Sequence, residues 1–259
     1  DTALAPAGLM RAALVEAYGW CSGRRAFQRR LIDQPLMRAV LADLALEWEG
    51  ALALGLRVAR AFDGAAEADR PFARIAVALA KYLSNKRCTW VVAEAMECLG
   101  GMGYVEDTPL PMLYREAPLN GIWEGSGNVI CLDILRSLVR DPAARAALAQ
   151  ELDAARGGAR AYDAALAAHR AAWPGAVPEA EARRFVEGLA MLLTAAVLLR
   201  EGPDTVAAAY VATRLDARRG QTPGAIGQRD VGAILARLGA DGQARGQGAW
   251  GGKGPNTGL

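Results

Sequence analysis

From Pro35 to Phe62 the chain reads PLMRAVLADLALEWEGALALGLRVARAF. Apolar residues in this stretch recur every three or four positions, which places them on one face of an α-helix. The pattern continues for about seven turns, so the helix is about 40 Å long at 1.5 Å per residue. Pro35 suits the start of a helix and Asp63-Gly64 suits its end. The stretch therefore predicts one long amphipathic helix.

Three further stretches have the same apolar spacing and predict long helices: Leu9 to Ile32, about Ala68 to Leu99, and about Ser126 to Val139. Residues 105–121 contain three prolines, so we expect a long connection there rather than a continuous helix. The other connections are short. Four long helices joined in this way predict an antiparallel four-helix bundle over residues 1–139.

A second set of helices begins at Asp141-Pro142, with prolines in first turns and glycines after last turns marking most boundaries. We expect helices at roughly Pro142–Arg156, Gly158–Trp173, Pro178–Arg200, Pro203–Arg219 and Asp230–Leu238. The predicted fold class is all-α, with the bundle in residues 1–139 and an appended helical domain in 140–240. Residues 241–259 are rich in glycine, and we expect a flexible tail.

Composition and charge exclude several classes of protein. Apolar residues make up 53% of the 259 positions and the net charge is +2, which is typical of a packed globular protein and does not demand a polyanionic partner. The four cysteines have no CxxC spacing and there is one histidine, so we expect no metal site. Buried reduced thiols suggest a cytoplasmic protein. The longest strongly apolar run, Leu189 to Leu199, is too short to cross a bilayer, and we expect no membrane partner.

Two glycine-containing segments stand at predicted helix ends: ECLGGMGY, residues 97–104, and IWEGSGN, residues 122–128. Backbone can approach a cofactor closely at such positions. Glu124, between an aromatic residue and a glycine just before a helix, can present its carboxylate in a cleft. The alternative is a negative charge that favours the dipole of the following helix.

These two segments, with REAPLN at residues 115–120, resemble the carboxy-terminal half of FAD-dependent acyl-CoA dehydrogenases and, more narrowly, their AidB-like branch. The resemblance implies that Glu124 removes the α-proton of an acyl-CoA thioester while hydride leaves the β-carbon for the flavin. It also implies that Trp123 and Arg136 are active-site residues. Trp123 replaces the tyrosine usual in fatty-acid enzymes, which argues against a straight-chain acyl substrate. Without the resemblance, Arg136 reads as an i, i+3 partner of Asp133.

The same resemblance implies six residues that bind FAD. They are Arg24, Glu97, Gly100, Gly101, Ser126 and Asn128. Arg24 belongs to a segment resembling Arg-x-Ala-Phe-Gly, in which Gln28 stands for the glycine, and Glu97 stands where most of the family has glutamine. Ser126 and Asn128 match a Thr-x-Gln pair that supports the FAD diphosphate. Ser126 also suits a helix N-cap, and both roles can coexist.

AidB-like proteins are associated with the response to DNA alkylation, and their extra carboxy-terminal helices are implicated in binding double-stranded DNA. In this chain Arg214 and Arg218 lie one helical turn apart and Arg219 follows, which makes them candidates for a basic face. Acidic residues in the same region nearly balance the charge. The alternative interpretation is a solvated helical cap over an apolar core.

Taken together, these residues predict the C-terminal part of an FAD-dependent acyl-CoA dehydrogenase-like flavoprotein. We expect the intact protein to be a homotetramer with an amino-terminal helical domain and a β-domain that are absent here. The isolated chain is therefore expected to bind FAD weakly and to be inactive. The alternative is an AidB-type DNA-binding flavoprotein of the alkylation response with little dehydrogenase activity.

Overall fold

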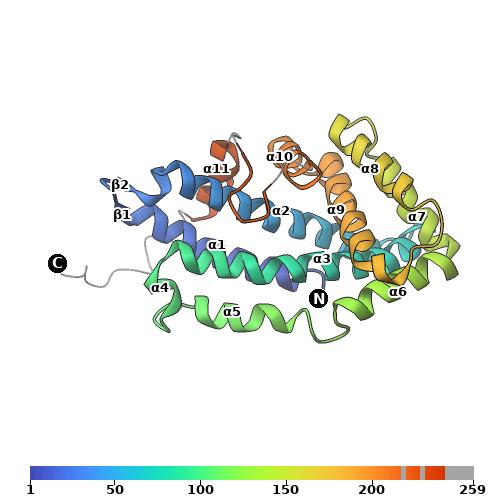
Figure 1. Cartoon of the computed structure of the whole chain (residues 1–259), viewed down its shortest axis with the longest axis horizontal. Coiled ribbons are helices and arrows are strands. Elements are labelled where there is room, and N and C mark those ends of the chain that lie inside the picture. The colour runs from blue at the N-terminus through green and yellow to red at the C-terminus, as the bar shows by residue number, and fades with distance from the viewer. Residues whose placement is uncertain (217–219, 228–230, 243–259) are drawn as a thin grey trace.

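The computed structural model describes residues 1–216, 220–227 and 231–242, and in these the chain is all-α, as expected (Figure 1). Its α-helices are α1 (Ala5–Gly23), α2 (Pro35–Asp63), α3 (Asp69–Cys98), α4 (Gly101–Tyr104), α5 (Leu110–Leu119), α6 (Gly127–Arg140), α7 (Pro142–Asp153), α8 (Arg160–Ala172), α9 (Ala182–Glu201), α10 (Asp204–Arg214) and α11 (Val231–Gly242). Two 3₁₀ helices, η1 (Leu31–Asp33) and η2 (Glu179–Glu181), and two short strands, β1 (Arg25–Ala26) and β2 (Arg29–Arg30), complete it. The expected tail begins inside α11, and residues 243–259 lie outside the described residues.

Helices α1, α2 and α3 lie side by side and alternate in direction, which confirms three sides of the predicted bundle (Figure 1). The fourth side consists of two helices, α5 and α6, which run in the same direction and are separated by a loop at residues 120–126. Helix α5 packs against α3 and α1. The break in this fourth side is the most irregular part of the bundle.

Helix α5 corrects the expectation of an irregular connection over residues 105–121. Pro109 is its N-cap residue and Pro111 lies in its first turn, where a missing backbone N–H costs no helical hydrogen bond. Pro118 lies within the last turn. Two of the three prolines therefore begin a helix rather than prevent one.

The first helix ends earlier than its apolar spacing predicts. Helix α1 stops at Gly23, and β1 and β2 then form a two-stranded antiparallel hairpin before η1. The two turn residues, Phe27 and Gln28, have φ values of +50° and +67°. Positive φ at both central residues is the geometry of a type I′ turn, whose twist matches that of the strands but which favours glycine and asparagine. The expected helix to Ile32 is therefore wrong beyond Gly23.

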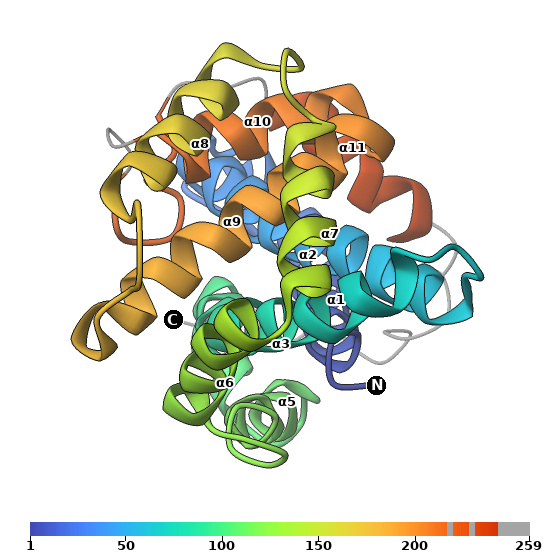
Figure 2. The same cartoon turned by 90° about the vertical axis from the view of Figure 1, so that its right-hand side faces the viewer.

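The second set of helices packs directly on the bundle. Helix α7 lies against α3, α9 crosses α2 and α3, and α10 and α11 cover α2 (Figure 2). Buried residues of both sets form one continuous hydrophobic cluster. Helix α2 is consequently enclosed on two sides, and from Leu41 to Ala51 every residue is buried. The predicted regions 1–139 and 140–240 share this core.

No helix within the described residues is both long enough and apolar enough to cross a membrane.

The hairpin turn yields a first prediction. Glycine tolerates φ near +67° without the steric cost that glutamine carries, and the bond from Arg25 Nη2 to the Gln28 backbone carbonyl (3.1 Å) does not need the Gln28 side chain. We expect Gln28→Gly to raise the free energy of unfolding by about 0.5–1 kcal/mol, measured by urea denaturation. Gln28→Ala is the control and should give no gain. A lower unfolding free energy for Gln28→Gly would contradict the strained turn.

Candidate active site

The loop between α5 and α6 turns tightly at Trp123, Glu124 and Gly125, and the last two residues have positive φ. Glu124 has φ +54° and Gly125 has φ +109°. A positive φ is uncommon for glutamate and persists only where the surroundings enforce it. The enforcing group is Lys81 of α3, whose Nζ donates hydrogen bonds to the backbone carbonyls of Trp123 (2.5 Å) and Gly125 (2.8 Å). The loop thus folds around a lysine, with Glu124 at its apex.

Lys81 is 6% exposed, which is unusual for a lysine. Burial lowers the pKa of its ammonium group, and the nearby charge of Glu124 acts in the opposite direction. The sequence analysis did not single out Lys81. No local pattern distinguishes Lys81, because its neighbours one turn further along the same helix face, Ser84 and Asn85, are also polar and buried.

The side chains of the loop face outward. Trp123 is 52% exposed and Glu124 is also exposed. They lie within a series of exposed apolar side chains along α4, α5 and α6, which comprises Tyr104, Val105, Met112, Tyr114, Leu119, Ile122, Val129 and Val139. Where such side chains form a contiguous patch, they mark a contact site.

Ser126 and Asn128 lie at the N-terminus of α6. Ser126 is the N-cap residue, but its hydroxyl makes no capping hydrogen bond. The Oδ1 atom of Asn128 accepts a hydrogen bond from Nε of Arg183 at the start of α9 (2.8 Å). Lys86 approaches the same point, its Nζ lying 3.3 Å from where a Cβ on Gly127 would be. Two cations beside a helix N-terminus and a free hydroxyl make a chemically suitable place for an anionic group.

The other expected cofactor residues lie at the C-terminal end of α3, whereas Lys81 and Lys86 lie near its middle. Gly100 has φ +60° and a Cβ there would meet no heavy atom within 4 Å, so its backbone is accessible. Gly101 begins α4, while Glu97 in the last turn of α3 and Arg24 after α1 are exposed. From Lys81 to Gly100 the rise along α3 is about 28 Å. The structure therefore separates the expected site residues into two groups.

Arg136 belongs to neither group. It lies about two and a half turns along α6 from Gly127, exposed, with Nη1 3.9 Å from Oδ1 of Asp133. Asp133 also accepts hydrogen bonds from Arg74 of α3, the shortest at 3.1 Å. Within the described residues, the structure places Arg136 with Asp133 and not beside Trp123.

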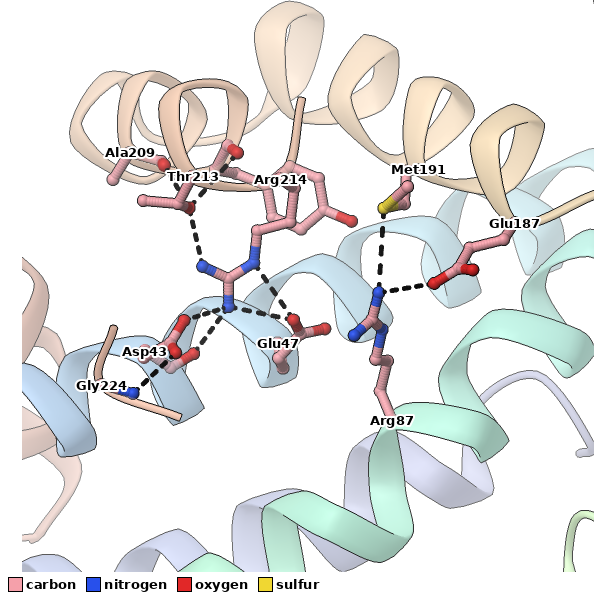
Figure 3. Close-up of polar contacts among 10 residues, drawn as sticks. Asp43, Glu47, Arg87, Glu187, Met191, Ala209, Thr213, Arg214 and Gly224 are labelled. Carbon is pink, nitrogen blue, oxygen red and sulfur yellow. Dashed lines mark hydrogen bonds and ion pairs between the residues drawn. The ribbon is translucent and has the colours of Figure 1, made fainter. Parts of the chain in front are cut away.

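The structure corrects the basic face that was expected on α10. The side chain of Arg214 is 1% exposed, and its Nη2 lies 2.6 Å from Oδ1 of Asp43 and 3.0 Å from Oε1 of Glu47 (Figure 3). Arg237 of α11 is likewise paired with Glu49 at 2.5 Å. Arg214 is therefore not available to a DNA duplex, because its guanidinium is buried and forms ion pairs with the carboxylates of α2. Arg218 and Arg219 lie outside the described residues.

The structure also places the cysteines and the other potential metal ligands. All four cysteines are buried and free. Over residues 1–216, 220–227 and 231–242 no group of histidine, cysteine, aspartate and glutamate is placed to hold a metal ion.

Residues 1–139 match the family model for "Acyl-CoA dehydrogenase, C-terminal domain". The chain belongs to this family.

Among individual relatives, the chain is 40% identical over 222 residues to the putative acyl-CoA dehydrogenase AidB of Escherichia coli, a match that covers 85% of this chain and 41% of AidB. It is 34% identical over 133 residues to the bovine mitochondrial short-chain specific acyl-CoA dehydrogenase, covering 51% of this chain and 31% of that protein. The chain thus spans less than half the length of these relatives.

A solved structure shows the same fold over nearly the whole chain. The Caenorhabditis elegans protein ACDH-11, solved in complex with C11-CoA, matches with a TM-score of 0.74 and 24% identity, over 94% of this chain and 45% of that one. A Bacillus anthracis acyl-CoA dehydrogenase complexed with FAD matches with a TM-score of 0.57 and 14% identity, over 93% of this chain and 45% of that one. At these identities the likeness concerns the fold, and it includes the second set of helices.

Lys81 can be tested as the group that holds the loop. Lys81→Met keeps the length of the apolar stem but removes both donors, a loss of about 1–3 kcal/mol of local hydrogen bonding. We expect the amides of Ile122 and Trp123, which bond to the carbonyl of Leu119 at 2.9 and 3.2 Å, to exchange with solvent at least about tenfold faster. Hydrogen exchange followed by NMR measures this. Arg70→Met, at an exposed cation in the first turn of the same helix, is the control, and unchanged exchange in Lys81→Met would refute the holding role.

Arg214 can be tested as a buried structural cation. Arg214→Met leaves Asp43 and Glu47 without their guanidinium, so we expect the free energy of unfolding to fall by about 3–5 kcal/mol. Arg184→Met, at an exposed arginine paired with Glu181, is the matched control and should change stability little. Urea denaturation of both variants distinguishes them. Equal effects would show that Arg214 is not a buried structural cation.

Proposed function

We propose that this chain is the C-terminal part of an FAD-dependent acyl-CoA dehydrogenase in which Glu124 removes the α-proton of an acyl-CoA thioester. The observation that carries the proposal is the loop held by Lys81. Its two hydrogen bonds fix the backbone on both sides of Glu124 and so direct the glutamate away from the bundle core. A catalytic base needs this fixed position, because proton transfer depends on short donor and acceptor distances.

Residues near the middle of α3 and at its C-terminal end are chemically suited to FAD. Near α6, Lys86, Arg183 and the free hydroxyl of Ser126 would hold an anionic diphosphate. At Gly100 and Gly101 the open backbone would admit a dinucleotide, and Arg24 adds an exposed guanidinium. The flavin, when bound, supplies the acceptor for the hydride that leaves the β-carbon. The carboxylate of Glu97 would repel a phosphate but could accept a hydrogen bond from a ribose hydroxyl.

The exposure of Glu124 in this chain supports the proposal that further domains complete the site. A carboxylate that acts as a base near neutral pH needs a dry environment to raise its pKa. The apolar surface along α4, α5 and α6, which surrounds Trp123, offers the contact area for such a cover. We therefore propose that the chain alone binds FAD weakly and does not turn over acyl-CoA.

The separation of the two groups of site residues supports a homotetramer. About 28 Å of helix lies between Lys81 and Gly100, and Arg24 lies with the distant group. We propose that the two groups of one chain serve different flavins, so that each flavin site combines residues of two subunits. The exposed side chains of Phe27 and Leu36, near the hairpin, add apolar area for that contact.

An AidB-type role in DNA binding is the alternative, and the described arginines do not favour it. The candidate Arg214 forms ion pairs with Asp43 and Glu47 of α2, and Arg237 of α11 forms one with Glu49. We therefore favour dehydrogenation over DNA binding and propose that the ring of Trp123 narrows the acyl pocket.

The test uses this chain joined to the amino-terminal helical domain and β-domain that we propose for the whole protein, purified with FAD. Flavin bleaching is followed anaerobically with a panel of acyl-CoA thioesters. We expect at least one thioester to bleach the flavin, and Glu124→Gln to slow bleaching by about a hundredfold or more, since it removes the base.

Glu116→Gln, at another exposed glutamate on α5, is the matched control and should bleach like the unmodified protein. Bleaching that persists in Glu124→Gln would remove Glu124 as the base. An unreduced flavin with every thioester would overturn the dehydrogenase proposal and leave the DNA-binding alternative.

A further inference from the structure

An apolar cavity of about 590 Å³ is lined by residues of α6, α7, α8 and α9 and of the loop after α8, and by none of the Glu124 loop. Its volume falls in the range of ordinary small-molecule sites. Each of the four helices contributes at least one leucine to the lining: Leu138, Leu148, Leu166 and Leu189. Apart from the residues of α6, the lining comes from the second set of helices.

An aromatic cluster forms one wall of the cavity. The ring of His169 lies 4.7 Å from that of Trp173 and 5.0 Å from that of Phe185, measured between centroids. Nε2 of His169 is 3.1 Å from the carbonyl oxygen of Phe185, which fixes the imidazole in place. Burial lowers the pKa of His169, so the neutral imidazole is favoured and the wall stays uncharged.

The charged residues at the cavity have one sign. Arg145 and Arg170 line it, and no aspartate or glutamate does, all the lining residues being in the described part of the chain. Arg170 donates two hydrogen bonds to the carboxylate of Asp153, at 2.9 and 3.1 Å, which neutralises it. Arg145 is exposed and has no such carboxylate partner among the described residues. One guanidinium at an apolar cavity complements a ligand with one anionic end.

The dimensions favour an extended ligand. On α7 the lining runs from Arg145 to Leu152, which is about 10 Å along the helix axis. We propose that this cavity binds a medium-chain carboxylic acid, with the hydrocarbon chain against the leucines and aromatic rings and the carboxylate on Arg145. This site is separate from the proposed acyl-CoA site and does not depend on it.

The test measures binding of decanoate to the 259-residue chain by calorimetry, below the concentration at which decanoate forms micelles. Decyltrimethylammonium has a similar chain and the opposite charge. We expect one saturable site for decanoate and much weaker binding of the cation. Arg145→Gln should weaken decanoate binding about tenfold, the expected loss for a charge-assisted hydrogen bond. Arg160→Gln, at an exposed arginine outside the cavity, should leave it unchanged.

Two filling variants test the location. Ala149→Trp places a ring in the cavity from α7, and Gly175→Trp does so from the loop after α8, where a Cβ meets no heavy atom within 4 Å. Both should abolish decanoate binding while circular dichroism stays unchanged. Retained binding in a folded filling variant, or equal binding of the cationic amphiphile, would overturn the proposal. The proposal would also be overturned if decanoate did not bind and the chain self-associated in a way that Ala149→Trp abolishes. That result would assign the cavity to a second copy of the chain.

Discussion

The rest of the structure depends on the neutralisation of buried carboxylates in the middle of α2. Asp43, Glu47 and Glu49 lie where both faces of the helix are covered, and an unpaired buried charge costs several kcal/mol. Arginines of the second set of helices supply the opposite charge: Arg214 to Asp43 and Glu47, and Arg237 to Glu49. The bundle and the second set of helices are therefore held together in one arrangement. Removing the second set would expose apolar surface and would leave the carboxylates of α2 without their arginine partners.

The same logic of a buried charge with defined partners governs the candidate active site. The ammonium group of Lys81 is buried, and hydrogen bonds to the carbonyl oxygens of Trp123 and Gly125 replace those that it would make with water. These bonds require a tight loop, and the tight loop gives Glu124 its positive φ. The break between α5 and α6 is thus a consequence of placing a lysine on the buried face of α3.

Apolar spacing predicted the long helices well because burial on one face repeats with the helical period. Pro35 to Asp63 is the clearest example. The hairpin at Phe27 and the helix α5 were missed for local reasons: a type I′ turn without glycine has no composition signal, and prolines at a helix start look the same as prolines that break one. The glycine loops and Glu124 could be found from their motif. Lys81 could not, because its role depends on a loop more than forty residues away.

Arginines in the second set of helices show why counting charges along a sequence misleads about surfaces. Spacing along the sequence placed Arg214 on one face of a helix. It could not show that this face of α10 packs against α2. Arg183 was not among the predicted site residues, yet its Nε donates a hydrogen bond to Oδ1 of Asn128 at the N-terminus of α6. That bond ties the start of α9 to the segment that follows Glu124. The second set therefore bears on the candidate site as well as on stability, and a change within α9 can reach the proposed flavin end of the bundle through a single side chain.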